Sequence, residues 1–286
     1  MIMDRKMRLG LLYISLIVIF SGCQAVGNDQ TYDIYQSSMV AMKAANSYGF
    51  EMEINQSILR DDFGIFNQHP VKLMATGKMR EEPLTVEMEM YNHDGKTVVD
   101  YYLNQDDLYE RRRSSSDQWF IKENRQFGDE LDTFQAEIGN LLAKERAGIE
   151  LQMQEESYLM VIKNANLEYL EKIFVEIVAE PLEKYFAELA DGNDLDTNKI
   201  IVDVRVPEMQ IWIDKINNFH QQYQLDMKIA IVCKQKEAVI NQRVFMDFQD
   251  HGKYEDLQIP ADIMTEAIDY DQYMRYRLPV YPRINE

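Results

Sequence analysis

The chain has 286 residues, of which 46% are hydrophobic and 28% are charged, a composition typical of a folded globular protein. Its formal net charge at pH 7 is −19. Proteins that bind nucleic acid use patches of Lys and Arg to displace phosphate counterions, so this charge argues against a nucleic-acid partner. It also argues against a domain that lies flat on anionic lipid.

The first 22 residues have the features of an export signal. Three basic side chains lie near the start, and the apolar run from Leu9 to Phe20 follows them. This run of about 12 residues is too short to cross the ~30 Å hydrocarbon core of a membrane as a helix. Ser21 and Gly22 are small, and they directly precede Cys23. The pattern predicts export and cleavage at this point.

Residues 20–23, Phe-Ser-Gly-Cys, resemble the lipobox of bacterial lipoproteins. In that family the cysteine sulfur receives a diacylglycerol and the chain is cut just before it, which implies lipidation of Cys23 and cleavage between Gly22 and Cys23. Two acyl chains anchor a protein stably, at ~0.8 kcal/mol per buried CH₂. The resemblance implies a lipid anchor at the extracytoplasmic face of the cell membrane, with residues 23–30 as a short polar tether. The alternative is an ordinary secretory signal with an unrelated cysteine.

One domain is expected over residues 31–270, with a C-terminal tail over 271–286. Its first element, Thr31 to Asn46, is predicted to be a helix, because Tyr35 and Met42 lie on one apolar stripe. Directly after this helix the apolar period changes to two, which predicts strands with one buried and one solvated face. This alternation covers residues 48–55, 71–80, 84–90, 97–103, 108–113, 118–122, 158–163, 200–206, 210–214, 219–232 and 240–248.

Helices are expected to interrupt the strands. Phe127 to Arg146 and Leu167 to Ala190 are predicted to be amphipathic helices, and Pro260 is expected to start a short one. Pro207 is expected to end the strand over residues 200–206, since proline donates no ladder hydrogen bond.

Alternation in the long strand over residues 219–232 places Tyr223 on the buried face and His220 on the solvated face. Cys233 continues the buried face. It is expected to be a buried thiol without a disulfide partner, because the only other cysteine is Cys23.

Three stretches together resemble a known lipoprotein family. The helix containing Met39 to Tyr48 runs directly into a one-sided strand, and residues 118–122 follow a hairpin. Residues 211–218 form a hairpin that leads to long strands, residues 257–263 and a closing helix. This order resembles lipoproteins of Gram-positive bacteria that look like distant relatives of the LolA/LppX lipoprotein carriers. The resemblance implies an α+β fold, in which a curved antiparallel half-barrel sheet holds acyl chains beneath helices that cover its concave face.

The apolar strand faces are rich in methionine, of which the chain has 17. Flexible thioether side chains fill irregular apolar space, so these positions suit a packed core or a cavity that accepts acyl chains. A copper site is a further alternative. The side chains expected to line a cavity are Phe50, Met52, Met88, Met90, Phe174, Ile177, Met227 and Met246.

Signals for catalysis and cofactors are weak. The four histidines lack the spacing of a zinc motif, and no Gly-x-Ser-x-Gly sequence or Gly-rich phosphate loop is present. Residues 191–196 resemble a loose calcium loop, but the glutamate required at its twelfth position is replaced by Val202. We therefore expect no catalytic residue, no metal and no cofactor.

Arg111, Arg112 and Arg113 form a basic cluster in an acidic chain. We interpret it as a charged hairpin end. The alternative is a contact with lipid phosphate or an anionic wall polymer.

Taken together, these features predict a non-enzymatic, membrane-anchored protein that binds a lipid or other amphiphile between its sheet and its helices. The alternative is a surface protein–protein interaction or sensory module with a filled core. A third class is an envelope hydrolase, because the 49 Asp and Glu residues allow a catalytic carboxylate pair.

Overall fold

The computed structural model describes residues 30–64, 70–92, 94–113, 117–123, 149–163, 171–172, 175, 200–233 and 235–270. The lipidation and cleavage residues, the helix predicted over 127–146, the acidic stretch over 191–196 and the tail over 271–286 lie outside these ranges. Of the helix predicted over 167–190, only Glu171, Lys172 and Val175 are described, and all three are helical.

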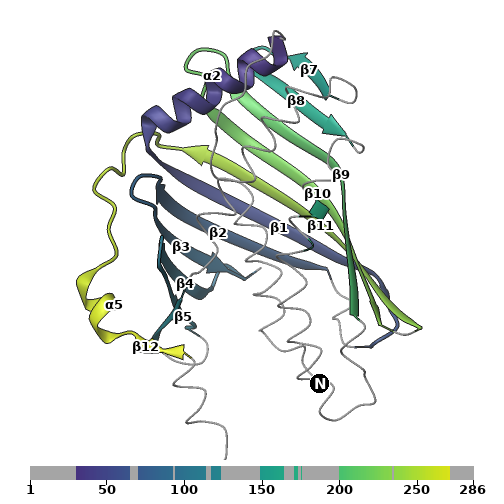
Figure 1. Ribbon diagram of the computed structural model, residues 1–286, viewed down its shortest axis with the longest axis vertical. Coiled ribbons are helices and arrows are strands. Elements are labelled where there is room, and N and C mark those ends of the chain that lie inside the picture. The colour runs from purple at the N-terminus through teal and green to yellow at the C-terminus, as the bar shows by residue number, and fades with distance from the viewer. Residues whose placement is uncertain are drawn as a thin grey trace, which may run out of the picture.

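The described part of the chain is mostly β, and it forms one open, curved, largely antiparallel sheet of twelve strands (Figure 1). Its helices are α2, Gln30–Ala45, and α5, Ala261–Glu266. The strands are β1 Ser47–Asp61, β2 Val71–Arg80, β3 Thr85–Tyr91, β4 Thr97–Asn104, β5 Asp107–Arg111, β6 Trp119–Glu123, β7 Ile149–Met153, β8 Ser157–Lys163, β9 Ile200–Asp214, β10 His220–Cys233, β11 Lys236–Gln249 and β12 Ile268–Asp269.

Two meanders meet in the middle of the sheet. The strand order is β12-β6-β5-β4-β3-β2-β1-β11-β10-β9-β8-β7, so β1 to β6 and β7 to β11 each follow the chain from neighbour to neighbour. The first strand of one meander pairs with the last strand of the other along almost their whole length, from Gly49 opposite Gln249 to Asp61 opposite Ala238. This pairing of distant segments makes the two meanders one sheet.

The core lies on one face of this sheet, as the period-two pattern predicts. Phe50, Met52 and Ile54 of β1 are buried, with 3% exposure or less, whereas the intervening Glu51 is exposed and Glu53 half-buried. Burying apolar area on one face contributes about 25 cal/mol per Å² removed from water. A register slip by one residue would place the charged set in the core, so this pattern specifies the register.

Helix α2 lies across one end of the sheet (Figure 1). Its buried residues recur at intervals of three and four, which places them on one side of the helix. Asn46 ends the helix with a φ of 55°, a conformation that asparagine tolerates, and its N–H donates to the Met42 carbonyl at 3.1 Å. The Asn46 side chain also bonds the backbone of Glu82, which ties the helix end to the turn before β3.

Pro207 does not end a strand, so that prediction was wrong. Strand β9 continues through it, and the pairing with β10 shifts register between Asp226 and Lys228. A bulge is where a sheet accepts proline, because one residue there has no ladder partner and no N–H is missed.

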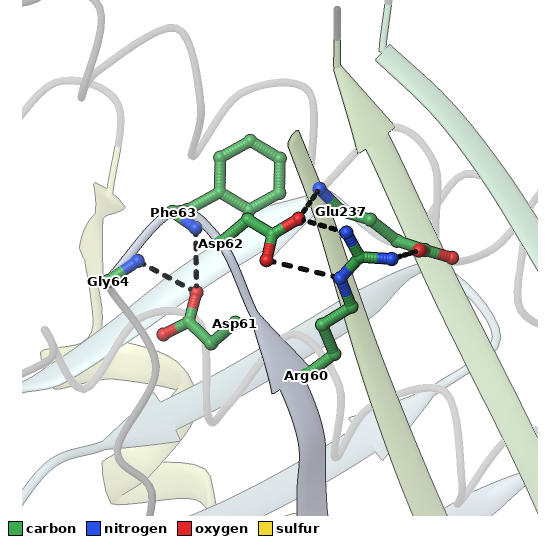
Figure 2. A network of polar contacts seen from close by, with 6 residues as sticks. All are labelled: Arg60, Asp61, Asp62, Phe63, Gly64 and Glu237. Atoms are coloured by element: carbon green, nitrogen blue, oxygen red, sulfur yellow. Dashed lines mark hydrogen bonds and ion pairs between the residues drawn. The ribbon is translucent and has the colours of Figure 1, made fainter. Parts of the chain in front are cut away.

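Strand β1 extends to Asp61, beyond the predicted strand over residues 48–55, and a network of ion pairs lies at its far end (Figure 2). Arg60 pairs with Asp62 at 2.7 Å and also with Glu237, at the start of β11. The Asp61 carboxylate accepts the Gly64 N–H at 2.9 Å, which holds the chain as it leaves the sheet. These contacts join the two strand ends, but exposed pairs of this kind contribute only ~0–1 kcal/mol each.

The C-terminal segment covers the other face of the sheet at its β6 edge. Ile263 of α5 and the preceding Ile259 pack with Tyr109 and Trp119 in a small second cluster. After α5, strand β12 adds to β6 in parallel. The sequence predicted the short helix at Pro260 but neither β12 nor the edge strand β7.

Candidate functional site

The structure brings together six of the eight side chains expected to line a ligand cavity. They belong to the main apolar core, and none is more than 5% exposed. The six are Phe50, Met52, Met88, Met90, Met227 and Met246. The other two, Phe174 and Ile177, lie outside the described residues.

Methionines from three strands form a row across the sheet. Met52 lies directly opposite Met246 on β11 and opposite Ala75 on β2, and Ala75 in turn lies opposite Met90 on β3. The row continues to Tyr223 on β10. Ala75 is a small residue between the thioethers of Met52 and Met90. Thioether side chains are flexible, which is a property expected of a surface that accepts variable apolar shapes.

On the same face, the neighbouring row of side chains, which includes Phe50 and Gly77, is tightly packed. A Cβ atom added to Gly77 would lie 2.3 Å from Cζ of Phe50 and 2.6 Å from the Glu87 carbonyl oxygen. The Phe50 ring therefore occupies the space over this glycine. Gly77 is required here because the aromatic ring and the β3 backbone leave no room for a side chain.

Two glutamines interrupt the apolar face. Gln56 and Gln242 are cross-strand partners on β1 and β11, are 7% and 2% exposed, and are hydrogen bonded to each other at 2.5 Å. Each side chain thus meets part of the other's need for a buried hydrogen-bond partner. This pair was not predicted from the sequence. The signal that could have found it is that Gln56 and Gln242 continue the inward-facing alternation, two residues after Ile54 and two before Val244.

A second polar network joins helix α2 to strand β10. Ser38 Oγ donates to the Tyr35 carbonyl at 2.7 Å and lies 2.7 Å from His220 Nε2. Because the serine proton is committed to that carbonyl, His220 Nε2–H is the donor and Ser38 the acceptor. His220 Nδ1 then accepts from the Tyr223 hydroxyl at 2.8 Å. All of these groups are buried, and a neutral imidazole satisfies every one of them.

His220 is on the buried face, so its predicted place on the solvated face was wrong. The pairing of β10 with β9 shifts register between His220 and Gln222, and this bulge turns the histidine to the same side as Tyr223. Strict alternation from the long strand could not reveal the extra residue.

This serine–histidine contact differs from that of a serine hydrolase. There, the histidine accepts the serine proton and the serine oxygen faces substrate. Here His220 donates to Ser38, and Ser38 is 0% exposed. The arrangement holds helix α2 on the sheet and leaves no nucleophile open to substrate.

We expect this network to make stability depend on pH. Burial lowers the pKa of His220 to about 3, with a further contribution from His251. An unfolded histidine has a pKa of about 6.5, so below that pH the unfolded chain takes up a proton that the native state excludes. The free energy of unfolding should therefore fall as the pH drops from about 6.5 toward 3, by up to ~1.4 kcal/mol per unit.

Denaturant unfolding at pH 7 and pH 4.5 tests this expectation. The unmodified protein should lose about 2–3 kcal/mol more between the two values than His220→Gln, which cannot titrate. The variant should be less stable at pH 7, because its buried partners lose hydrogen bonds. Equal losses in the two proteins would contradict a neutral, buried His220.

The three arginines of the basic cluster are paired within the protein. Arg111 and Arg113 each contact the Asp100 carboxylate at 2.8 Å, and Arg112 pairs with Glu110. Burial raises the pKa of Glu110, but Lys122, at 2.5 Å, and Arg112 bring it below its ordinary value. These contacts favour the interpretation of a charged hairpin end over an anion site.

No group of three His, Cys, Asp or Glu side chains among the described residues is arranged to hold a metal ion. The methionines proposed as an alternative copper set, such as Met79 and Met88, lie in the apolar core. Within the described ranges, none of the helices has the length and apolar character needed to cross a membrane.

Several solved structures share a distant similarity with this chain. An uncharacterized conserved protein from Thermus thermophilus matches with 7% identity and a TM-score of 0.33, over 84% of this chain and 99% of its own. MucB in complex with MucA(peri) matches with 8% identity and a TM-score of 0.28, over 82% of this chain and 61% of its own. With such low scores, neither match says anything about function.

No curated protein matches the chain at a significant level. One family does, and it covers residues 30–268, from the start of α2 to β12. The chain therefore belongs to the family described as "Family of unknown function (DUF6612)".

Proposed function

We propose that this protein is a non-enzymatic lipoprotein, anchored through Cys23 at the extracytoplasmic face of the cell membrane, that binds a lipid or other amphiphile. In this proposal the sheet is a half-barrel of the LolA/LppX kind, and helices cover its concave face above the bound acyl chain. The observation that supports it best is the methionine row across one sheet face, from Met90 through Met52 to Met246.

Energetics favour an apolar chain on such a face. Each CH₂ group moved from water contributes ~0.8 kcal/mol, so about ten of them contribute ~8 kcal/mol, which corresponds to micromolar affinity before other costs. Thioethers that change rotamer can admit the chain without breaking the sheet. The direction of the Ser38–His220 hydrogen bond supports a structural rather than a nucleophilic role for this pair.

A photoactivatable fatty acid tests the proposal. Full-length protein in membranes is incubated with a diazirine-labelled fatty acid, illuminated, digested and analysed by mass spectrometry. We expect adducts on the buried face, at Met52, Met90 and Met246. Met74 and Met153 are matched controls, since they are methionines of the same sheet that are 43% and 66% exposed. Adducts at the exposed methionines alone, or no adducts at all, would contradict the lipid-binding proposal.

The second candidate is a surface interaction or sensory module with a filled core. It is favoured by the Phe50 ring, which fills the space over Gly77. Crosslinking in cells from exposed positions, such as Ile216 at 92% exposure, would recover one specific protein and no lipid if this candidate is correct.

A further inference from the structure

A groove of about 620 Å³ lies on the opposite, polar side of the central strands. Its lining includes outward-facing residues of β1, β2, β10 and β11, together with Pro207 at the β9 bulge. We infer that this groove binds a phosphate group carried on a small polyhydroxylated molecule. This inference is independent of the amphiphile site, which is on the other face.

Three polar side chains form a line across the groove. Ser57 of β1 lies directly opposite Asn241 of β11, which lies directly opposite Lys228 of β10. Directly opposed residues have Cβ atoms about 4.5–5.5 Å apart, so a hydroxyl, an amide and an ammonium group face one small ligand together. None of these three side chains has a hydrogen-bond or ion-pair partner in the described part of the chain, so all three are available to a ligand.

The next row of outward-facing residues contains further charged side chains, and these are already partly paired. Arg243 forms an ion pair with Asp226, and Lys72 pairs with Glu53 at 2.7 Å. Among the described residues that line the groove, Lys228 is therefore the unpaired cation. Three cations and one carboxylate line the groove of a protein whose net charge is −19, so its local charge is opposite to that of the molecule. Such a site attracts an anion and repels cations.

The walls suit a ligand with carbon–hydrogen faces as well as an anion. Pro70 and Pro207 flank the groove, and the Phe245 side chain lies among its lining residues, 6.0 Å from the Arg243 guanidinium. An ammonium group recognises a phosphate as a point charge, while a serine hydroxyl and an asparagine amide bond alcohol groups in either direction. Glycerol phosphate, free or as a lipid headgroup, has this chemistry.

Calorimetric titration of the full-length protein with glycerol phosphate tests the inference. The protein is held in phosphatidylcholine nanodiscs through its own anchor. We expect saturable binding that weakens as salt is added, because exposed charges are screened. Lys228→Gln should weaken it roughly tenfold, the loss expected for one charge-assisted hydrogen bond, and Asn241→Ala should weaken it severalfold. Lys96→Gln, at an exposed lysine of the β3–β4 turn, should leave it unchanged.

The source of the phosphate is distinguished in a second arm. Phosphatidylglycerol in the same nanodisc should raise the apparent dissociation constant if a lipid headgroup reaches the groove, and should leave it unchanged if the ligand is soluble. Absence of saturable binding at millimolar concentrations, or equal affinities of the unmodified protein and Lys228→Gln, would overturn the inference. Because these side chains are on the solvated face, their loss should not change the fatty-acid adducts described above.

Discussion

Phe50→Ala is expected to lower the free energy of unfolding by about 3–5 kcal/mol, the cost of deleting a fully buried aromatic side chain. Phe50 is 0% exposed, on the central strand β1. Its ring covers Gly77 on β2, so the deletion leaves a cavity that the glycine cannot fill. Denaturant unfolding monitored by far-UV circular dichroism measures the loss.

Gly77→Ala, measured in the same experiment, separates the energy of the contact between Phe50 and Gly77 from the general cost of changing a core residue. The added methyl group would meet the Phe50 ring and the Glu87 carbonyl, so we expect a loss of about 1–3 kcal/mol from overpacking. In the double variant, the methyl group occupies part of the space vacated by the ring. The double loss should therefore be smaller than the sum, with a coupling of about 0.5–3 kcal/mol.

Gly49→Ala is the matched control for this cycle. A Cβ atom there would be 3.3 Å from Cγ of Gln249 and 3.4 Å from the Tyr254 side chain, which are close contacts rather than the collisions at 2.3 and 2.6 Å that a Cβ atom at Gly77 would meet. We expect a loss well below that of Gly77→Ala, and additivity with Phe50→Ala. If the losses in the free energy of unfolding of Phe50→Ala and Gly77→Ala were strictly additive, the Phe50 ring would not fill the space over Gly77.

Cys23→Ala is expected to abolish incorporation of radioactive palmitate and to release the protein into the medium. The sulfur of this residue is the proposed acceptor of the diacylglycerol, and without two acyl chains nothing of comparable strength holds the protein on the bilayer. Cells grown with labelled fatty acid, then separated into membrane and medium, give both measurements at once.

Cys233→Ala provides the control, because it removes the other cysteine of the chain. Cys233 is buried, with 1% exposure, and should carry no label, so its loss should change neither labelling nor location. Label that persists in Cys23→Ala would contradict the lipobox prediction. Unlabelled Cys23→Ala protein that stays with the membrane would instead point to a protein partner there.

Local patterns in the sequence predicted most of the elements. The period of two identified the buried face of β1, because neighbouring side chains in a strand point to opposite sides. The period of 3.6 identified α2, and the alternation over residues 84–90 and 97–103 identified β3 and β4. These signals depend on only a few neighbouring residues, so they can be identified without knowledge of the fold.

The predictions from alternation failed at β-bulges. The bulge beside His220 reversed the face of one residue, and the bulge at Asp226 and Lys228 allowed β9 to continue through Pro207. An added residue in one strand is visible only against the strand beside it. The Ser38–His220–Tyr223 network depends on the bulge beside His220, which is why it was missed. The arginine pairings were not foreseen for another reason: Arg111 and Arg113 reach Asp100 on the neighbouring strand β4, and local patterns do not show which strands are neighbours.

The sequence alone determined which side of most strands is apolar and where α2 ends and β1 begins. It also predicts an export signal with a cysteine before the domain. Only the tertiary structure decided that β1 pairs with β11, that His220 bonds Ser38 across 182 positions of the chain, and that Ser57, Asn241 and Lys228 form one line. The physical reason is that the two kinds of information act over different distances along the chain. The alternation of apolar and polar residues shows only whether a residue is buried relative to its neighbours in sequence. Register between distant strands depends instead on the packing of the whole face.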